Sequence, residues 1–143
     1  MSADSAVLSE ITKAFAAAPR PEHFTNFTHC PECAEHDQTL IDHTPDTISL
    51  DQLGFPGWDP ICFISVPGYL YYFPGLSRLA LEHTDDYLDQ FLFSLNHERV
   101  EAMTPMQRAA VLTLLEFIQK KSFSHEWNDV LQRQIKRFKQ SLT

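Results

Sequence analysis

The sequence predicts an all-α protein, a compact single-domain bundle of about six to seven helices, several of them short, formed by residues 1–143. Apolar residues recur at helical spacing along most of the chain, and helix-capping residues and prolines mark the starts and ends of these runs. Strict apolar–polar alternation never persists, so a β-sheet has little support. A 43% hydrophobic content that includes 11 Phe residues is sufficient for one sizeable core.

The first two helices follow from capping and proline signals. A first helix begins at residues 4–5, where Asp or Ser can cap it, and ends before Pro19. Its apolar residues recur at helical spacing: Val7, Leu8, Ile11, Ala14, Phe15 and Ala18. A second helix has Cys30 at its N-cap and Pro31 in its first position, and it runs to about Asp42.

The middle of the chain predicts short, abutting helices. Ser49 opens a capping box, and Gly54 ends the helix after one or two turns. Residues 59–60 and 65–67 are two further helix-entry signals that contain proline. Pro74 then interrupts the apolar series, because proline in a helix interior removes a hydrogen bond and clashes with the preceding turn.

Three helices complete the prediction. One stripe has helical spacing and follows two aspartates that suit a helix N-terminus: Tyr87, Leu88, Phe91, Leu92 and Leu95. Thr104 opens a capping box and a long core helix with apolar residues Ala110, Leu114, Phe117 and Ile118. The last helix follows Ser124, with its apolar stripe at Trp127, Leu131, Ile135, Phe138 and Leu142.

The charge distribution favours a protein partner. The net charge is −8, and residues 1–121 carry 17 acidic against 7 basic residues, whereas residues 122–143 carry 2 against 4. An acidic surface repels phosphate backbones and attracts basic proteins, so we expect no nucleic-acid partner. The N-terminus lacks the pattern of an export signal, and no apolar run reaches bilayer length. The sequence therefore predicts a soluble, cytoplasmic protein with reduced cysteines and no membrane partner.

Residues 29–37 are the most chemically informative segment, because they contain five potential metal ligands in nine positions. Cys30, Cys33 and His36 fall on one face of the predicted second helix. Cys62 is the remaining thiol and can arrive from the turn at residues 59–60. We therefore predict a structural Cys3His zinc site formed by Cys30, Cys33, His36 and Cys62. His29 and His43, just outside the helix, are the reserve nitrogen ligands.

The same segment supports two alternatives. A thiol at a helix N-terminus has a lowered pKa, which suits Cys30 for redox chemistry. No strand precedes the motif, however, and acidic neighbours such as Glu32 and Glu35 oppose activation by raising thiol pKa values. The other alternative is that the cysteines are plain core thiols, which behave as small hydrophobes.

Three further runs of sequence are informative: Trp58-Asp59-Pro60-Ile61-Cys62-Phe63-Ile64-Ser65, Tyr71-Tyr72-Phe73-Pro74 and Thr104-Pro105-Met106-Gln107-Arg108-Ala109-Ala110-Val111. Together they resemble a family of small bacterial proteins known only as a domain of unknown function. The resemblance covers residues 45–120, and some members also carry a segment similar to residues 29–37. The chain departs from the family at residues 65–68, where members usually have Ser-Pro-Glu-Ala. The resemblance implies a bacterial source and no known activity, so it assigns no residue a role.

Small size, acidity and the predicted zinc site together favour a non-enzymatic protein-binding module, of the kind that serves as an immunity factor or an adaptor. Its expected partner is a basic protein surface. The competing class is an enzyme, either a thiol oxidoreductase that uses Cys30 and Cys33 or a metal-dependent hydrolase with an open coordination position. A closed four-ligand site favours the binding module.

Overall fold

The computed structural model describes residues 2–121 and 128–143, and over these residues it confirms the predicted all-α fold. The elements are α1 (Ala3–Phe15), α2 (Pro31–Ile41), α3 (Leu50–Leu53), η1 (Pro56–Trp58), η2 (Pro60–Cys62), α4 (Val66–Glu82), α5 (Leu88–Ser94), α6 (His97–Glu101), α7 (Pro105–Lys121) and α8 (Asn128–Ser141). The expected cap Ser124 and core residue Trp127 lie outside the described residues. Among the described helices, none has the length and apolarity needed to cross a bilayer.

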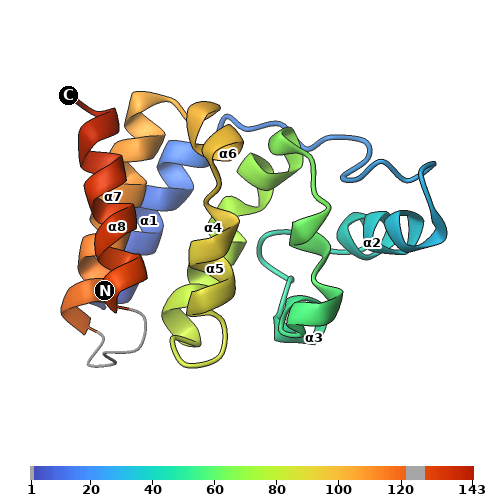
Figure 1. The fold of residues 1–143 in the computed structure, drawn as a ribbon, viewed down its shortest axis with the longest axis horizontal. Coiled ribbons are helices and arrows are strands. Elements are labelled where there is room, and N and C mark those ends of the chain that lie inside the picture. The colour runs from blue at the N-terminus through green and yellow to red at the C-terminus, as the bar shows by residue number, and fades with distance from the viewer. Residues whose placement is uncertain (1, 122–127) are drawn as a thin grey trace.

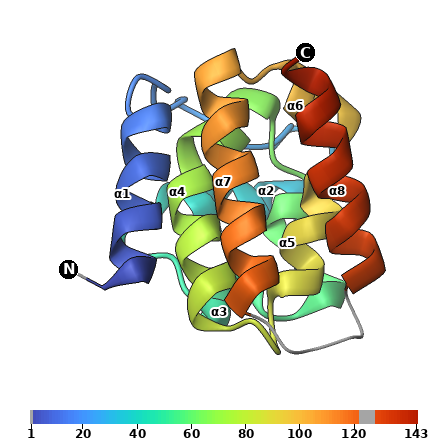
Figure 2. The ribbon, with the colours of Figure 1, turned by 90° about the vertical axis from the view of Figure 1, so that its left-hand side faces the viewer.

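The helices form a bundle with a smaller region at one end. Helices α1, α7 and α8 lie side by side, with α7 between the other two (Figure 2). Helix α4 packs against α1 and α5, and α5 reaches α8. Helix α2 lies at the far end of the long axis, away from α7 and α8, and contacts the short helix η2 (Figure 1). Residues 29–37, which contain the predicted metal ligands of α2, therefore lie toward one end of the molecule.

Helix α4 differs from its prediction, because it continues through Pro74 to Glu82 instead of breaking. Proline in a helix interior costs about 3 kcal/mol. The rings on the preceding turn outweigh that cost, since Tyr72 and Phe73 are completely buried and Phe73 stacks on Phe15 with ring centroids 4.6 Å apart. Packing with distant parts of the chain therefore overrides the local signal.

Three arginines hold the irregular segments of the smaller region in place. Each guanidinium donates to two backbone carbonyls: Arg20 to those of Ile41 and His43, Arg78 to those of Pro45 and Ile48, and Arg99 to those of Ile61 and Ser94. Buried carbonyls need such partners, so these bonds replace regular secondary structure.

Gly75 allows the loop before α3 to approach α4. A Cβ atom at this position would lie 2.6 Å from the carbonyl oxygen of Pro45 and 3.0 Å from Ile48 Cγ2. Alanine normally stabilises a helix by about 1 kcal/mol relative to glycine, but here it collides with backbone. We expect Gly75→Ala to lower the free energy of unfolding by about 1–3 kcal/mol in urea denaturation.

Gly57→Ala is the matched control for this substitution. Its Cβ would meet only the ring of Phe55, at 3.3 Å, and that ring is 70% exposed and can move. Its effect should remain within about 0.5 kcal/mol. Equal effects of the two substitutions would contradict the close approach at Gly75.

Candidate metal centre

The N-terminus of α2 brings two cysteines and a histidine together. Cys30 is the N-cap residue, with extended φ and ψ of −162° and 166°, and Pro31 follows in the first turn. The sulfurs of Cys30 and Cys33 are 3.2 Å apart, and the Cys33 sulfur lies 3.7 Å from His29 Nδ1. The three potential ligand atoms lie within 4.8 Å of one another. Tetrahedral zinc–sulfur bonds of about 2.3 Å place two sulfurs roughly 3.8 Å apart, so small adjustments accommodate an ion.

The two thiols differ in acidity. The backbone N–H of Cys33 donates to the Cys30 sulfur, and together with the Cys33 thiol and His29 it lowers the pKa of Cys30 to about 7. The hydrogen bond with Cys30, followed by burial, raises the pKa of Cys33. The acidic residues that sequence analysis expected to oppose activation are thus outweighed at Cys30 by direct hydrogen bonds. At neutral pH, the pair holds one thiolate in a large fraction of molecules.

Asp37 fixes the loop that precedes these residues. Its carboxylate Oδ1 accepts the backbone N–H groups of Phe24 and Thr25 at 2.6 and 3.1 Å, and Oδ2 lies 2.7 Å from His23 Nδ1. The Thr25 hydroxyl in turn donates to the carbonyl of Cys33 at 2.7 Å. The loop is therefore tied to the helix turn that carries Cys33, and Asp37 acts as a structural acceptor.

His36 does not join the group formed by His29, Cys30 and Cys33. Its ring is completely buried, and the ring centroid lies 4.6 Å from the ring centroid of Trp58 and 4.9 Å from that of Phe63. The offset of six positions from Cys30 to His36 corresponds to about 9 Å along the helix axis. Cys30 and His36 were predicted to share one helix face, but they lie too far apart along it to bind one ion without movement.

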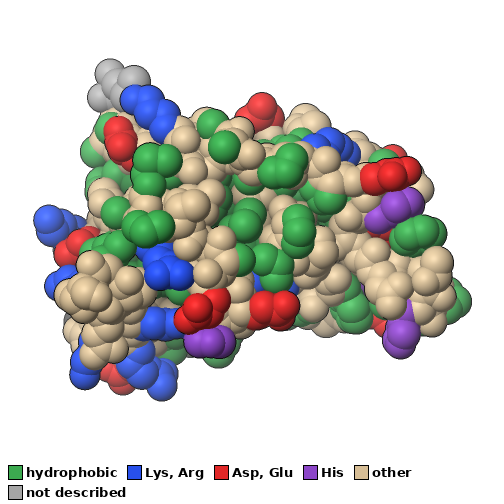
Figure 3. All heavy atoms as spheres, turned by 90° about the horizontal axis from the view of Figure 1, so that it is seen from above, with side chains coloured by type: hydrophobic (Ala, Val, Ile, Leu, Met, Phe, Trp, Pro, Cys, Tyr) green, Lys and Arg blue, Asp and Glu red, His purple; other side chains and the backbone are tan. Residues whose placement is uncertain are grey.

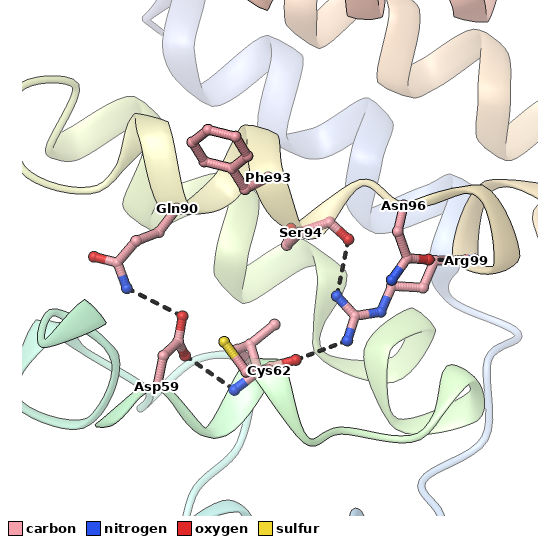
Figure 4. A pocket seen from close by; sticks show the side chains of 8 residues that line it. Asp59, Cys62, Gln90, Phe93, Ser94, Asn96 and Arg99 are labelled. Carbon is pink, nitrogen blue, oxygen red and sulfur yellow. Dashed lines mark hydrogen bonds between the residues drawn. The ribbon is translucent and has the colours of Figure 1, made fainter. Parts of the chain in front are cut away.

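Cys62 is also separate from the group, so the predicted set of Cys30, Cys33, His36 and Cys62 is not assembled in this structure. Although η2 packs against α2, the exposed Cys62 lines a cavity together with Asp59 and Arg99 (Figure 4). Burial, and then the charge of Asp59, raise the pKa of Cys62.

The two reserve histidines have different positions. His29 belongs to the group, whereas His43 follows the opposite end of α2. Helical periodicity could not place His29, because it precedes the helix. Its position next to an N-cap cysteine was the only available sequence signal.

Comparisons of the chain with protein-family models, with curated proteins and with solved structures give no match. The structure by itself defines an all-α protein with a His-Cys-Cys group that can hold a metal ion. Further conclusions about function depend on the geometry of that group and of the surface around it.

Replacing the buried imidazole of His36 by an apolar ring is expected to stabilise the protein, although most core substitutions destabilise. Among the described residues, neither ring nitrogen has a hydrogen-bond partner, and Glu32 Oε1 lies 3.5 Å from Nε2. A buried polar atom without a partner costs about 1–3 kcal/mol, and a phenyl ring of similar shape fits between the two aromatic neighbours. We expect His36→Phe to raise the free energy of unfolding by about 1 kcal/mol or more, measured by chemical denaturation.

His97→Phe is the control for this substitution, because the His97 side chain is 83% exposed. Its effect should stay within about 0.5 kcal/mol. A loss of stability in His36→Phe would show that the imidazole makes a compensating polar interaction in solution.

Proposed function

We propose that this protein is a non-enzymatic, zinc-binding module for protein interaction. One observation carries the metal proposal, namely the convergence of the Cys30 and Cys33 sulfurs and His29 Nδ1 within 4.8 Å. Thiolate and imidazole are the preferred ligands of zinc, and a Cys30 pKa of about 7 makes a thiolate available at neutral pH. Hard cations such as magnesium prefer oxygen ligands, so this donor set favours zinc.

The three donors leave one coordination position for a ligand outside this group. Zinc bound by three protein side chains keeps a fourth site for water or for another ligand. In this proposal, the metal fixes the turn at Cys30 and Cys33 and does not connect α2 to Cys62. His29 is exposed and Cys30 half-buried, so an ion can enter directly from solvent.

The surface around α2 supports a basic protein partner. Residues 21–77 contain no Lys or Arg and eight acidic residues, of which all but Asp37 and Asp59 are at least partly exposed. Most Lys and Arg side chains visible in Figure 3 gather instead at the end formed by α1, α7 and α8. The same acidic stretch exposes four large aromatic side chains: Phe27, Phe55, Trp58 and Phe63. Aromatic anchors within a field of one charge suit a partner of opposite charge, with association that weakens as salt rises.

The resemblance to a bacterial family supports placing this module in the bacterial cytoplasm. Reducing conditions there keep the cysteines available as thiols. An immunity- or adaptor-like role fits the acidic surface.

Metal content and thiol reactivity test the zinc proposal. Untagged protein should contain one zinc ion per chain by elemental analysis. In a thiol-labelling experiment, Cys62 should react at the same rate with and without a chelator, whereas Cys30 and Cys33 should react only after a chelator is added. Cys62 thus serves as an internal control, because it is exposed and lies outside the group. Metal-free protein in which all three thiols react without the chelator would contradict the proposal.

Retention of protein partners tests the interaction proposal. Immobilised protein should retain basic proteins from a bacterial lysate at low salt and release them at high salt. Trp58→Ala should reduce this retention, whereas Met106→Ala, which changes a 65% exposed side chain at the start of α7, should not. Failure to retain any protein at low salt would count against the interaction.

A second function, thiol oxidoreductase, is favoured by one specific observation. The Cys30 and Cys33 sulfurs are 3.2 Å apart, and Cys30 has the lower pKa of the two. In such a reaction, the Cys30 thiolate attacks a substrate disulfide, which forms a mixed disulfide and expels the first substrate thiolate. Cys33 then loses its proton to solvent and attacks Cys30 Sγ, which expels the second substrate thiolate, and both substrate thiolates take up protons from solvent. The substrate gains two electrons, and the protein is left with a Cys30–Cys33 disulfide.

Redox titration distinguishes this second function from zinc binding. Metal-free protein equilibrated with glutathione buffers should form a reversible intramolecular disulfide, detected as a loss of two hydrogen masses. Stable zinc occupancy, together with no such disulfide across the glutathione range, would exclude the oxidoreductase and leave the metal proposal intact.

A further inference from the structure

A cavity lies outside the metal centre, between η2 and the segment that joins α5 to α6. The cavity has a volume of about 230 Å³. Figure 4 shows Asp59 and Arg99 on opposite sides of Cys62, with Phe93 and Ser94 of α5 across from them. Pockets for drug-sized ligands have volumes of roughly 300–1,000 Å³, so this cavity suits a smaller molecule.

One wall carries a buried carboxylate whose hydrogen-bond donors, among the described residues, are both neutral. Asp59 is only 7% exposed, and its two oxygens accept the backbone N–H of Ile61 at 2.9 Å and the amide Nε2 of Gln90 at 3.0 Å. Both donors are neutral, and each carboxylate oxygen keeps a further acceptor site. Beside Asp59, the Oε1 atom of Gln90 is buried and has no hydrogen-bond partner among the residues that the structure describes. This wall therefore has unused capacity to bind a cation.

The opposite wall carries a buried guanidinium whose hydrogen-bond acceptors, within the described part of the chain, are neutral carbonyls. Arg99 is 7% exposed, donates to the carbonyls of Ser94 and Ile61 at 2.8 and 2.7 Å, and covers the ring of Tyr69. These two bonds use two of the five N–H donors of the group. Among the described ion pairs, Arg99 and Asp59 form none with each other. Burial raises the pKa of Asp59 although the charge of Arg99 acts to lower it, so the attraction between the two groups does not offset the cost of burial. Each group therefore favours an additional hydrogen-bonding partner of opposite charge.

We propose that this cavity binds a small zwitterion of the α-amino-acid class, with its ammonium group toward Asp59 and its carboxylate toward Arg99. A guanidinium recognises a carboxylate with good geometry, and a carboxylate accepts strong hydrogen bonds from an ammonium group. Ile61 and the neutral thiol of Cys62 then face a short ligand side chain. Binding in this cavity is independent of the metal centre, because none of these residues belongs to the His-Cys-Cys group.

Matched ligands test the proposal without altering the fold. Titration calorimetry of the protein, residues 1–143, should detect binding of L-alanine or glycine. Alaninamide lacks the carboxylate and N-acetylalanine lacks the ammonium group, so each should bind at least about tenfold more weakly than alanine. That factor corresponds to the loss of one charge-assisted hydrogen bond. Equal binding of the neutralised analogues, or no binding of any amino acid at millimolar concentration, would overturn the proposal.

Protein variants locate the binding site. Cys62→Leu fills the cavity without removing either charge and should abolish alanine binding, whereas Cys30→Ser should leave it unchanged. Asp59→Asn should weaken binding of alanine by about tenfold or more, with less effect on N-acetylalanine, which has no ammonium group. Thermal unfolding of each variant verifies that the fold persists. Unchanged alanine binding in a folded Cys62→Leu variant would place the ligand elsewhere and refute the assignment.

Discussion

Replacing Cys33 by serine is expected to abolish stoichiometric zinc binding. Cys33 is the central donor of the group, because its sulfur lies 3.2 Å from that of Cys30 and 3.7 Å from His29 Nδ1. A serine hydroxyl stays protonated at neutral pH and is a poor zinc ligand, so the variant keeps only one thiol and one imidazole. Loss of a supporting interaction alone weakens metal sites by about 10–100-fold, and we expect loss of this ligand to exceed that range. Competition with a chromophoric chelator measures the change.

Cys62→Ser is the matched control, because it makes the same chemical change at a thiol that faces the cavity beside Asp59. It should keep one zinc ion per chain with unchanged affinity. If Cys62→Ser instead lost zinc as completely as Cys33→Ser, the four-ligand site predicted from the sequence would form in solution. The pair of variants therefore distinguishes a local three-ligand zinc site from a four-ligand site that connects α2 to Cys62.

Local signals in the sequence predicted local structure well. The capping box at Thr104 is present, with reciprocal bonds of 2.9 and 3.1 Å to Gln107, and Cys30 caps α2 as expected. Each of these motifs satisfies helix-end N–H groups with side chains a few residues away, so it requires no knowledge of the remaining fold. The pairing of Cys30 with Cys33 belongs to the same class, since one helical turn separates them.

Predictions that depended on distant contacts were less successful. Helix α4 passes through Pro74 because aromatic burial outweighs the local break. The short helix α6 had no prediction, although Asn96 caps it. The predicted approach of Cys62 to the pair of Cys30 and Cys33 depends on how η2 packs against α2. No local sequence pattern specifies which face of η2 points toward α2. The cavity at Asp59 and Arg99 was unpredictable for the same reason, because its two charges come from segments about forty residues apart.

Replacing Asp37 by alanine is expected to cause a large loss of stability, about 3–5 kcal/mol. The carboxylate is only 3% exposed and serves two backbone N–H groups and the ring of His23. Removing it leaves the amides of Phe24 and Thr25 buried without an acceptor, at about 1–3 kcal/mol each, and removes the charge opposite His23. Urea denaturation monitored by circular dichroism measures the loss.

Asp37→Asn provides a graded comparison. Both backbone amides bind the same oxygen, Oδ1, which an asparagine carbonyl can replace, so only the bond from His23 is lost. This variant should cost about 1–2 kcal/mol. If asparagine and alanine destabilised the protein equally, the charge of Asp37 and not its backbone bonds would hold the loop.

The pH dependence of these variants tests the same carboxylate. Burial alone would raise the pKa of Asp37, but hydrogen bonds from His23, Phe24 and Thr25 outweigh burial and place it below the ordinary value. A folded pKa below the unfolded pKa of about 3.9 contributes stability that is complete above the unfolded value. That contribution is lost as the pH falls from about 4 through the lower folded pKa. The stability difference between wild type and Asp37→Asn should therefore be constant from pH 7 to about 5 and should shrink below pH 4. A difference that stays constant down to pH 3 would mean that the Asp37 charge does not hold the loop against α2.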